Sequence, residues 1–182
     1  MANNYGKRFE SNFRDSCIQQ GYLVERFQDS NKFGTGQGTR FTMTSPCDFL
    51  IFDGNYLFYI ELKSSLTGSI SFNNPPDAKT EKTVSIKPHQ IKALLQRNKY
   101  ANVVCGLVLD FADRKLKHGT VEGGCYFIEI DTFYDWVISC EKNSINKEDA
   151  ERIGIEVPRE KKKVNYSYDI DTMIEQIVKY VF

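Results

Sequence analysis

Apolar and polar residues alternate along the chain with two different periods, which predict a succession of helices and strands. From Tyr5 to Gln20 the apolar side chains recur at helical spacing, and Gly21 follows where a helix would end. The segment from Tyr22 to Phe27 is predicted to be a strand. Two further apolar runs, Phe49–Phe52 and Tyr56–Ile60, are rich in strand-forming residues and flank a turn signal, so they predict an antiparallel hairpin.

The second half of the chain continues this mixed pattern. Pro88 suits the first turn of a helix that begins at Ser85 or Lys87. The other predicted elements are strands at Val103–Phe111 and Cys125–Ile130, a turn-like segment at Asp113–Gly124, a helix from Asp131 or Thr132 to about Cys140, a short helix at Lys147–Ile153 and a helix with an apolar stripe from Ile170 to Val181. The two strands can extend the sheet begun by the hairpin, which predicts an α/β fold.

The segment Gln28–Ser45 is rich in Gly, Ser and Thr and predicts a flexible loop or an extended projection. Its alternating glycines lack the spacing and the following helix of a dinucleotide-binding fingerprint. Lys32 and Arg40 could contact phosphates there, and a merely mobile loop is the alternative. The basic run Lys161–Lys163 leaves the same two possibilities, a phosphate contact or a solvated face.

The hairpin carries the candidate chemistry. Glu61 and Lys63 share one face of their strand, because side chains two positions apart point the same way. A two-residue turn would place Asp48 opposite Tyr59 and diagonal to Glu61, roughly 7–8 Å away. A four-residue turn would place Asp48 directly opposite Glu61. Either even-length turn brings two carboxylates and one ammonium group together, whereas an odd-length turn would put Asp48 on the other face.

Two crowded carboxylates at the end of a strand need a cation nearby. Mg²⁺ suits a site with few protein oxygens, so Asp48 and Glu61 are predicted metal ligands, with the backbone carbonyl of Leu62 as a third. Such a metal activates water and neutralises charge on a phosphate oxygen. Lys63 would orient the attacking water or stabilise the developing negative charge. A buried salt-bridge network of the same side chains is the alternative.

Composition sets the class of protein. The chain has 182 residues, of which 41% are hydrophobic and 26% charged, with a net charge of zero. These values predict one globular domain over residues 1–182 and exclude a uniformly basic nucleic-acid binder. No apolar run is long enough to span a membrane, and the first residues lack the apolar part of a signal peptide, so we expect a cytoplasmic protein. The five cysteines form no zinc or disulfide pattern and predict free thiols.

The spaced pattern of Asp48 followed by Glu61-Leu62-Lys63 resembles the PD-(D/E)xK nuclease superfamily. Within it, the chain is most similar to Holliday-junction resolvases of the RecU type, also called penicillin-binding-protein-related factor A, which include phage-encoded members. The resemblance rests on Gly6-Lys7-Arg8-Phe9-Glu10, Asp48-Phe49, Glu61-Leu62-Lys63-Ser64 and Pro88-His89-Gln90-Ile91. The chain departs from the superfamily motif at one point: the proline usually comes directly before the aspartate, and here Cys47 separates Pro46 from Asp48.

This resemblance implies a restriction-endonuclease-like core at about residues 5–140, with a mixed central sheet flanked by helices and a C-terminal helical extension at about 145–182. It implies that Glu10, otherwise a surface partner of Arg14, joins Asp48 and Glu61 as a ligand of Mg²⁺, for which Mn²⁺ is a plausible substitute. Lys63 becomes the catalytic lysine. Gln90 is a further candidate near the site, and an exposed helix residue is the alternative.

The resemblance also implies a homodimer that binds branched DNA, with a stalk between the first two strands. In this chain the stalk would be Gln28–Ser45, which is short. The predicted function is therefore a Mg²⁺-dependent endonuclease that resolves four-way junctions. The alternatives are a restriction-like or repair nuclease on duplex or branched DNA, and a non-catalytic DNA-binding or structural protein. Candidate phosphate contacts are Lys7, Arg8, Arg14, Lys32, Arg40, Lys82, Lys87 and Lys92.

Overall fold

The computed structural model describes residues 3–27, 45–76, 78, 83–117 and 119–182. The predicted stalk therefore lies almost entirely outside the described residues, and so do Lys32, Arg40 and Lys82 among the candidate phosphate contacts.

Six strands of the described chain form the central sheet, in the order β1-β2-β3-β5-β8-β10. Neighbours β3 and β5 are parallel, and every other adjacent pair in this sheet is antiparallel. The predicted mixed sheet is thereby confirmed. The strands of this sheet are β1 (Leu23–Arg26), β2 (Phe49–Phe52), β3 (Leu57–Ser65), β5 (Val103–Phe111), β8 (Gly124–Glu129) and β10 (Ile155–Glu156).

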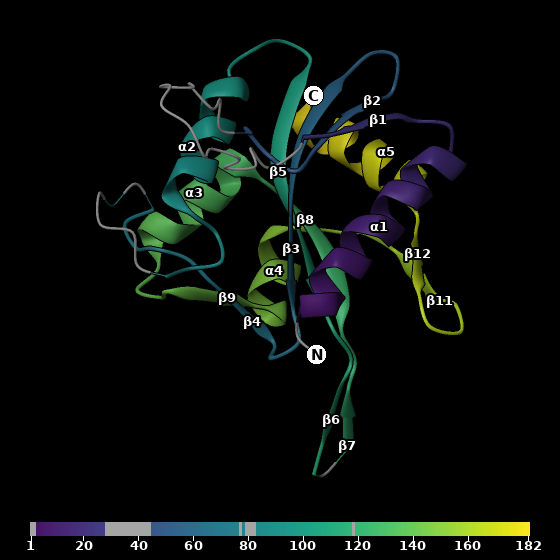
Figure 1. Cartoon of the computed structure of the whole chain (residues 1–182). Helices are drawn as coiled ribbons and strands as arrows, with labels where there is room; N and C mark the ends of the chain where they lie inside the picture. The colour runs from purple at the N-terminus through teal and green to yellow at the C-terminus, as the bar shows by residue number, and fades with distance from the viewer. Residues whose placement is uncertain (1–2, 28–44, 77, 79–82, 118) are drawn as a thin grey trace, which may run out of the picture.

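Helices cover both faces of the sheet (Figure 1). They are α1 (Asn3–Gln19), α2 (Pro88–Arg97), α3 (Ile130–Ser139), α4 (Lys147–Ile153) and α5 (Ile170–Val181). Helices α1 and α5 pack on one face, and α2, α3 and α4 pack on the other. The predicted α/β fold with flanking helices is confirmed.

Each face of the sheet has its own apolar core. Side chains alternate between the two faces along a strand, so a residue's position decides which core it enters. Along β3, Phe58, Ile60 and Leu62 pack under α1 and α5, whereas Tyr59 packs on the face that α2 and α3 cover. Glu61 and Lys63 have the same parity as Tyr59, so they point towards α2 and away from α1. This parity fixes the face of the sheet on which the candidate chemistry lies.

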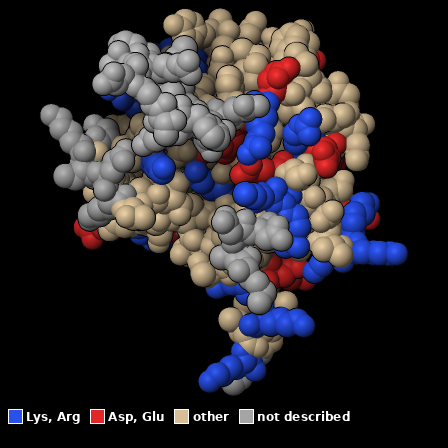
Figure 2. Space-filling view, in the orientation of Figure 1, with Lys and Arg blue, Asp and Glu red and all other residues tan. Residues whose placement is uncertain are grey.

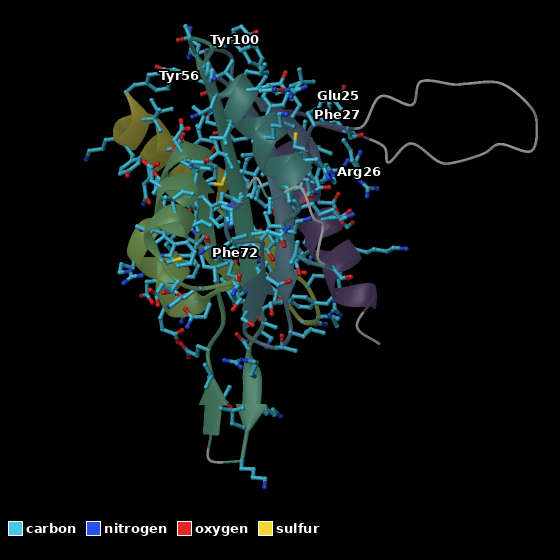
Figure 3. All side chains as sticks on the ribbon, turned by 90° about the vertical axis from the view of Figure 1, so that its left-hand side faces the viewer. Glu25, Arg26, Phe27, Tyr56, Phe72 and Tyr100 are labelled. Atoms are coloured by element: carbon cyan, nitrogen blue, oxygen red, sulfur yellow. The ribbon has the colours of Figure 1, made fainter. Side chains whose placement is uncertain are left out.

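Three smaller pairs of strands complete the described chain. They are β4 (Ser69–Ser71) with β9 (Ser144–Asn146), β6 (Arg114–Leu116) with β7 (Gly119–Val121), and β11 (Arg159–Lys161) with β12 (Tyr166–Tyr168). The β6–β7 hairpin extends away from the body of the molecule in both ribbon views (Figures 1 and 3).

Three predictions about elements need correction. The segment Asp113–Gly124 is no simple turn, because it contains the β6–β7 hairpin. Helix α3 begins earlier than predicted: Glu129 is its N-cap and accepts a hydrogen bond from the backbone N–H of Thr132. The C-terminal segment is not purely helical, because it supplies β10 to the central sheet and forms the β11–β12 pair.

Among the described residues, no helix combines the length and the apolar character needed to cross a membrane.

Candidate active site

The hairpin of β2 and β3 brings Asp48 beside Glu61. Phe49 pairs with Ile60 and Phe52 with Leu57, so residues 53–56 form a four-residue turn. The Asp53 side chain holds this turn, since its Oδ1 accepts hydrogen bonds from the backbone N–H groups of Asn55 and Tyr56 at 2.8 and 2.6 Å. Of the two even-length turns that the sequence allowed, the longer one is present. It places Asp48 opposite Glu61, one step beyond the last β2–β3 pair.

Asp48 is fixed at both ends by backbone hydrogen bonds. Its Oδ2 accepts from the backbone N–H of Leu62 at 2.8 Å, and its backbone carbonyl accepts from the N–H of Phe27 at 2.9 Å. The N–H and C=O of one strand residue point to the same edge of the strand. The Leu62 carbonyl is therefore directed to the strand edge at which Asp48 lies, and its role as a third oxygen ligand stays a prediction.

Glu61 is the buried centre of the site, with a relative exposure of 1%. Lys63 Nζ lies 2.8 Å from its Oε1, and the Gln90 Nε2 donates a hydrogen bond to the same oxygen. Burial raises the pKa of Glu61 to about 7; the Lys63 ammonium lowers it and the neighbouring Asp48 carboxylate raises it. A second cation near these two carboxylates would favour the ionised form of Glu61.

Helix α2 presents Gln90 to Glu61 in a fixed orientation. Gln90 occupies the third position of the helix, and its Oε1 accepts a hydrogen bond from the backbone N–H of Lys87 at 2.9 Å. With its oxygen held by the helix N-terminus, the amide nitrogen faces Glu61. Of the two possibilities for Gln90, contact with the site is the one observed.

Glu10, on helix α1, contacts a basic residue of β1. Its Oε2 lies 2.6 Å from Nη2 of Arg26 on β1. Helix α1 packs on the face of β3 that carries Leu62, whereas Glu61 points to the opposite face. Among the described residues, no three Asp, Glu, His or Cys side chains are close enough to share a metal ion. Of the three predicted carboxylates, Asp48 and Glu61 lie next to each other, and Glu10 as a third ligand stays a prediction.

Comparison with known proteins gives one clear relative. The chain is 34% identical over 190 residues to the SPbeta prophage-derived uncharacterized protein YotM of Bacillus subtilis (strain 168), covering 98% of this chain and 89% of that protein. The chain belongs to the YotM family. No family model matches its sequence. A solved structure with a looser likeness is Hjc of Archaeoglobus fulgidus, a Holliday junction resolvase, with 16% identity, a TM-score of 0.49 and coverage of 83% of this chain and 95% of that one.

In this YotM-family chain, two of the candidate phosphate contacts, Lys7 and Arg14, flank a hollow beside the hairpin. Lys7, Arg14 and Arg26 line this hollow of about 610 Å³ together with Glu10 and Phe49. Figure 2 shows basic and acidic side chains mixed across this view of the molecule. Three other candidates lie among the described residues. Arg8 lies over the ring of Tyr5. Lys87, the N-cap of α2, and Lys92, within α2, are both exposed.

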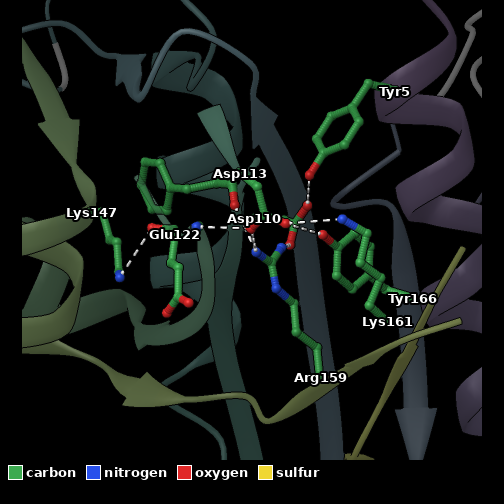
Figure 4. A network of polar contacts seen from close by, with 10 residues as sticks. Tyr5, Asp110, Asp113, Glu122, Lys147, Arg159, Lys161 and Tyr166 are labelled. Atoms are coloured by element: carbon green, nitrogen blue, oxygen red, sulfur yellow. Dashed lines mark hydrogen bonds and ion pairs between the residues drawn. The ribbon is translucent and has the colours of Figure 1, made fainter. Parts of the chain in front are cut away.

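The sequence did not reveal a second polar cluster, which connects β5, β11 and α1 (Figure 4). Asp110 has a relative exposure of 1%, and its carboxylate contacts Nη1 of Arg159 and the hydroxyl of Tyr5, both at 2.5 Å. Burial raises the pKa of Asp110, and the Arg159 guanidinium opposes that rise. A lone acid inside the apolar run Val103–Phe111 was the signal that could have indicated a buried cationic partner.

Proposed function

We propose that this YotM-family chain is a Mg²⁺-dependent endonuclease that resolves four-way DNA junctions by phosphodiester hydrolysis. The observation that carries the proposal is the convergence of Asp48, Glu61, Lys63 and Gln90 at one end of the β2–β3 hairpin. A structural salt bridge needs only one acid and one base. Here a second carboxylate, Asp48, lies beside the buried Glu61 and raises its pKa, and a bound cation would favour the ionised form of both groups.

The residues present fit a magnesium ion. Mg²⁺ sites in phosphoryl-transfer enzymes use one or two carboxylates and leave several positions to water and substrate. Asp48 and Glu61 would supply the carboxylates and Leu62 its backbone carbonyl, and Mn²⁺ can take the same ligands. The chemistry supplied by such a cation is activation of water and neutralisation of charge on the phosphate.

The side chains of the chain have separate roles in this proposal. Lys63 would orient the attacking water or stabilise the negative charge that develops on the phosphate oxygens. Gln90 is a positioning residue, because it acts through Glu61 and fixes the direction of that carboxylate. The exposed Lys7, Arg14 and Lys87 would contact phosphates of the DNA backbone and make binding strongly dependent on salt.

Resolution of a junction needs two symmetric cuts. We therefore propose a homodimer in which each protomer cuts one strand, since two-fold symmetry pairs the sites. Sedimentation of the purified protein would give a mass of about twice the 21.0 kDa of one chain. A monomer that stays monomeric on a junction would contradict paired cutting.

A panel of synthetic substrates tests the function. The purified protein is incubated with a four-way junction, a duplex of the same sequence and a single strand, each with Mg²⁺ and with EDTA. We expect symmetric nicks near the crossover in the junction alone, and only with Mg²⁺. Cutting of all substrates alike would favour a restriction-like or repair nuclease. No cutting of any substrate with Mg²⁺ or Mn²⁺ would contradict nuclease activity.

The ion pair between Glu61 and Lys63 favours one other candidate, a non-catalytic protein in which this pair is structural. A structural pair is distinguished by stability: removing Lys63 would leave Glu61 buried without its cation and lower the free energy of unfolding. In the nuclease, the same change would abolish cleavage while junction binding persists.

A further inference from the structure

The β6–β7 hairpin extends from the body next to the strand that carries the candidate site (Figures 1 and 3). Strand β5 pairs in parallel with β3, so that Lys63 lies beside Leu109, and the hairpin begins five residues later at Arg114. Strand β5 ends at Phe111, two residues or about 7 Å beyond Leu109, and residues 112 and 113 connect it to the hairpin. The hairpin therefore begins just beyond the end of the strand that pairs with β3.

The hairpin carries basic side chains and no acidic ones. Residues 114–121 contain Arg114, Lys115 and Lys117 but neither Asp nor Glu, and the basic side chains are visible on the projecting part of Figure 2. The nearest acid on the N-terminal side, Asp113, belongs to the base of the hairpin. Its Oδ1 accepts a hydrogen bond from the backbone N–H of Gly123 at 3.0 Å, and its Oδ2 lies 3.3 Å from Lys161 Nζ.

The two faces of the hairpin differ. Arg114 Nη1 donates a hydrogen bond to the backbone carbonyl of Thr67 at 2.8 Å. A Cβ at Gly68 would come within 2.4 Å of the Arg114 guanidinium carbon. A glycine at position 68 therefore leaves room for the Arg114 side chain to reach Thr67. Lys115 points to the face opposite Arg114, because adjacent strand residues alternate, and Lys117 follows β6 in the turn. Both are exposed.

We infer that the β6–β7 hairpin is a DNA-contacting arm that lies in a groove of a duplex next to the cut site. The major groove, about 12 Å wide, admits a two-stranded β-ribbon. Arg114 would fix the arm to the body, and Lys115 and Lys117 would contact backbone phosphates along the groove wall. This inference rests on the proposed nuclease function, because it takes duplex arms of a branched DNA as the partner.

A double variant, Lys115→Ala with Lys117→Ala, tests the arm. Binding of a fluorescent four-way junction and of a duplex is measured by anisotropy in EDTA over a series of salt concentrations, so that cleavage cannot interfere. We expect the affinity to fall about tenfold. The slope of log K against log salt should decrease by about 2, because each of the two lysines neutralises one phosphate in the wild-type complex.

The matched control is Lys99→Ala with Lys179→Ala, which removes the same charge from two exposed sites elsewhere, one in the turn after α2 and one in α5. If the two double variants had equal affinities and equal salt slopes, the hairpin would not be a DNA-contacting arm. The nuclease proposal would remain intact. Failure of the wild-type protein to bind junction or duplex would overturn both. Circular dichroism melts of both variants would match the wild type, because all four side chains are exposed.

Discussion

At the scale of single residues, Glu61 is the group on which the candidate site depends. The folded protein binds a proton on Glu61 more tightly than the unfolded chain does, because burial raises its pKa from 4.5 to about 7. Ionised Glu61 therefore lowers the free energy of unfolding as the pH rises from about 4.5 to 7. A buried carboxyl group with a strongly raised pKa is typical of a functional site rather than of one that stabilises the fold.

Replacing Glu61 by Gln is expected to stabilise the metal-free protein at pH 8. The amide resembles the neutral acid, so the net penalty for the buried charge disappears; the raised pKa already includes the attraction to Lys63, and we expect a gain of about 2–3 kcal/mol. At pH 4 the two proteins should unfold alike. Urea denaturation in EDTA at both pH values measures the difference, and a less stable Gln variant at pH 8 would contradict the burial argument.

Gln90 should affect catalysis without affecting binding. Gln90→Ala removes the donor that orients Glu61, so we expect the rate of junction cleavage at saturating protein to fall about tenfold. The matched control is Gln96→Ala, at an exposed position of the same helix. If both variants cut at the wild-type rate, or if Gln90→Ala loses junction affinity instead, the positioning role is wrong.

At the scale of elements, the sequence predicted most helices and strands but not the length of the turn or the docking of α1. Asp53-Gly54 looks like a two-residue turn, yet the Asp53 side chain caps two backbone N–H groups and favours four residues. Which face of the sheet α1 covers is decided by tertiary packing, so no local sequence pattern could predict it. The β6–β7 hairpin was missed because its strands of three residues carry no apolar alternation.

The turn can be tested by adding a single methyl group. Gly54 has φ of 102°, and a Cβ added there would have no atom within 4 Å, so Gly54→Ala should destabilise through backbone strain alone, by about 1 kcal/mol. Gly6→Ala is the control: Gly6 lies in α1, and its Cβ would make an ordinary contact with Ser64. It should instead stabilise by about 0.5–1 kcal/mol. Thermal melts that move both variants in the same direction would contradict this account of the turn.

At the scale of the whole molecule, the Asp110–Arg159 pair joins parts of the chain that are distant in sequence. The pair links the central β5 to the C-terminal segment. The Tyr5 hydroxyl also hydrogen-bonds Asp110, which connects the first helix to the same pair. The sequence showed that both residues are charged but not that they meet, because their contact spans 49 positions. This linkage and β10 make the C-terminal segment part of the main fold rather than an appended helix.

Arg159→Met is expected to lower the free energy of unfolding by about 3–5 kcal/mol, because it leaves Asp110 buried without its cation. The side chains of Arg159 and Asp110 are only 9% and 1% exposed. Lys162→Ala is the control, since the ion pair of Lys162 with Glu160 is exposed and its loss should change stability by less than about 0.5 kcal/mol. Denaturant unfolding would contradict the buried-pair account if both changes were small.

The most direct test of the central claim is the single-turnover rate at which Lys63→Ala cuts a four-way junction with saturating Mg²⁺, compared with the wild type and with Lys99→Ala. We predict a fall of about 100-fold or more for Lys63→Ala, with junction affinity retained, and no change for Lys99→Ala. The wild type should not cut in EDTA. Cutting by Lys63→Ala at the wild-type rate, or equal cutting by the wild type without a divalent metal, would contradict a metal-dependent site built on Asp48, Glu61 and Lys63.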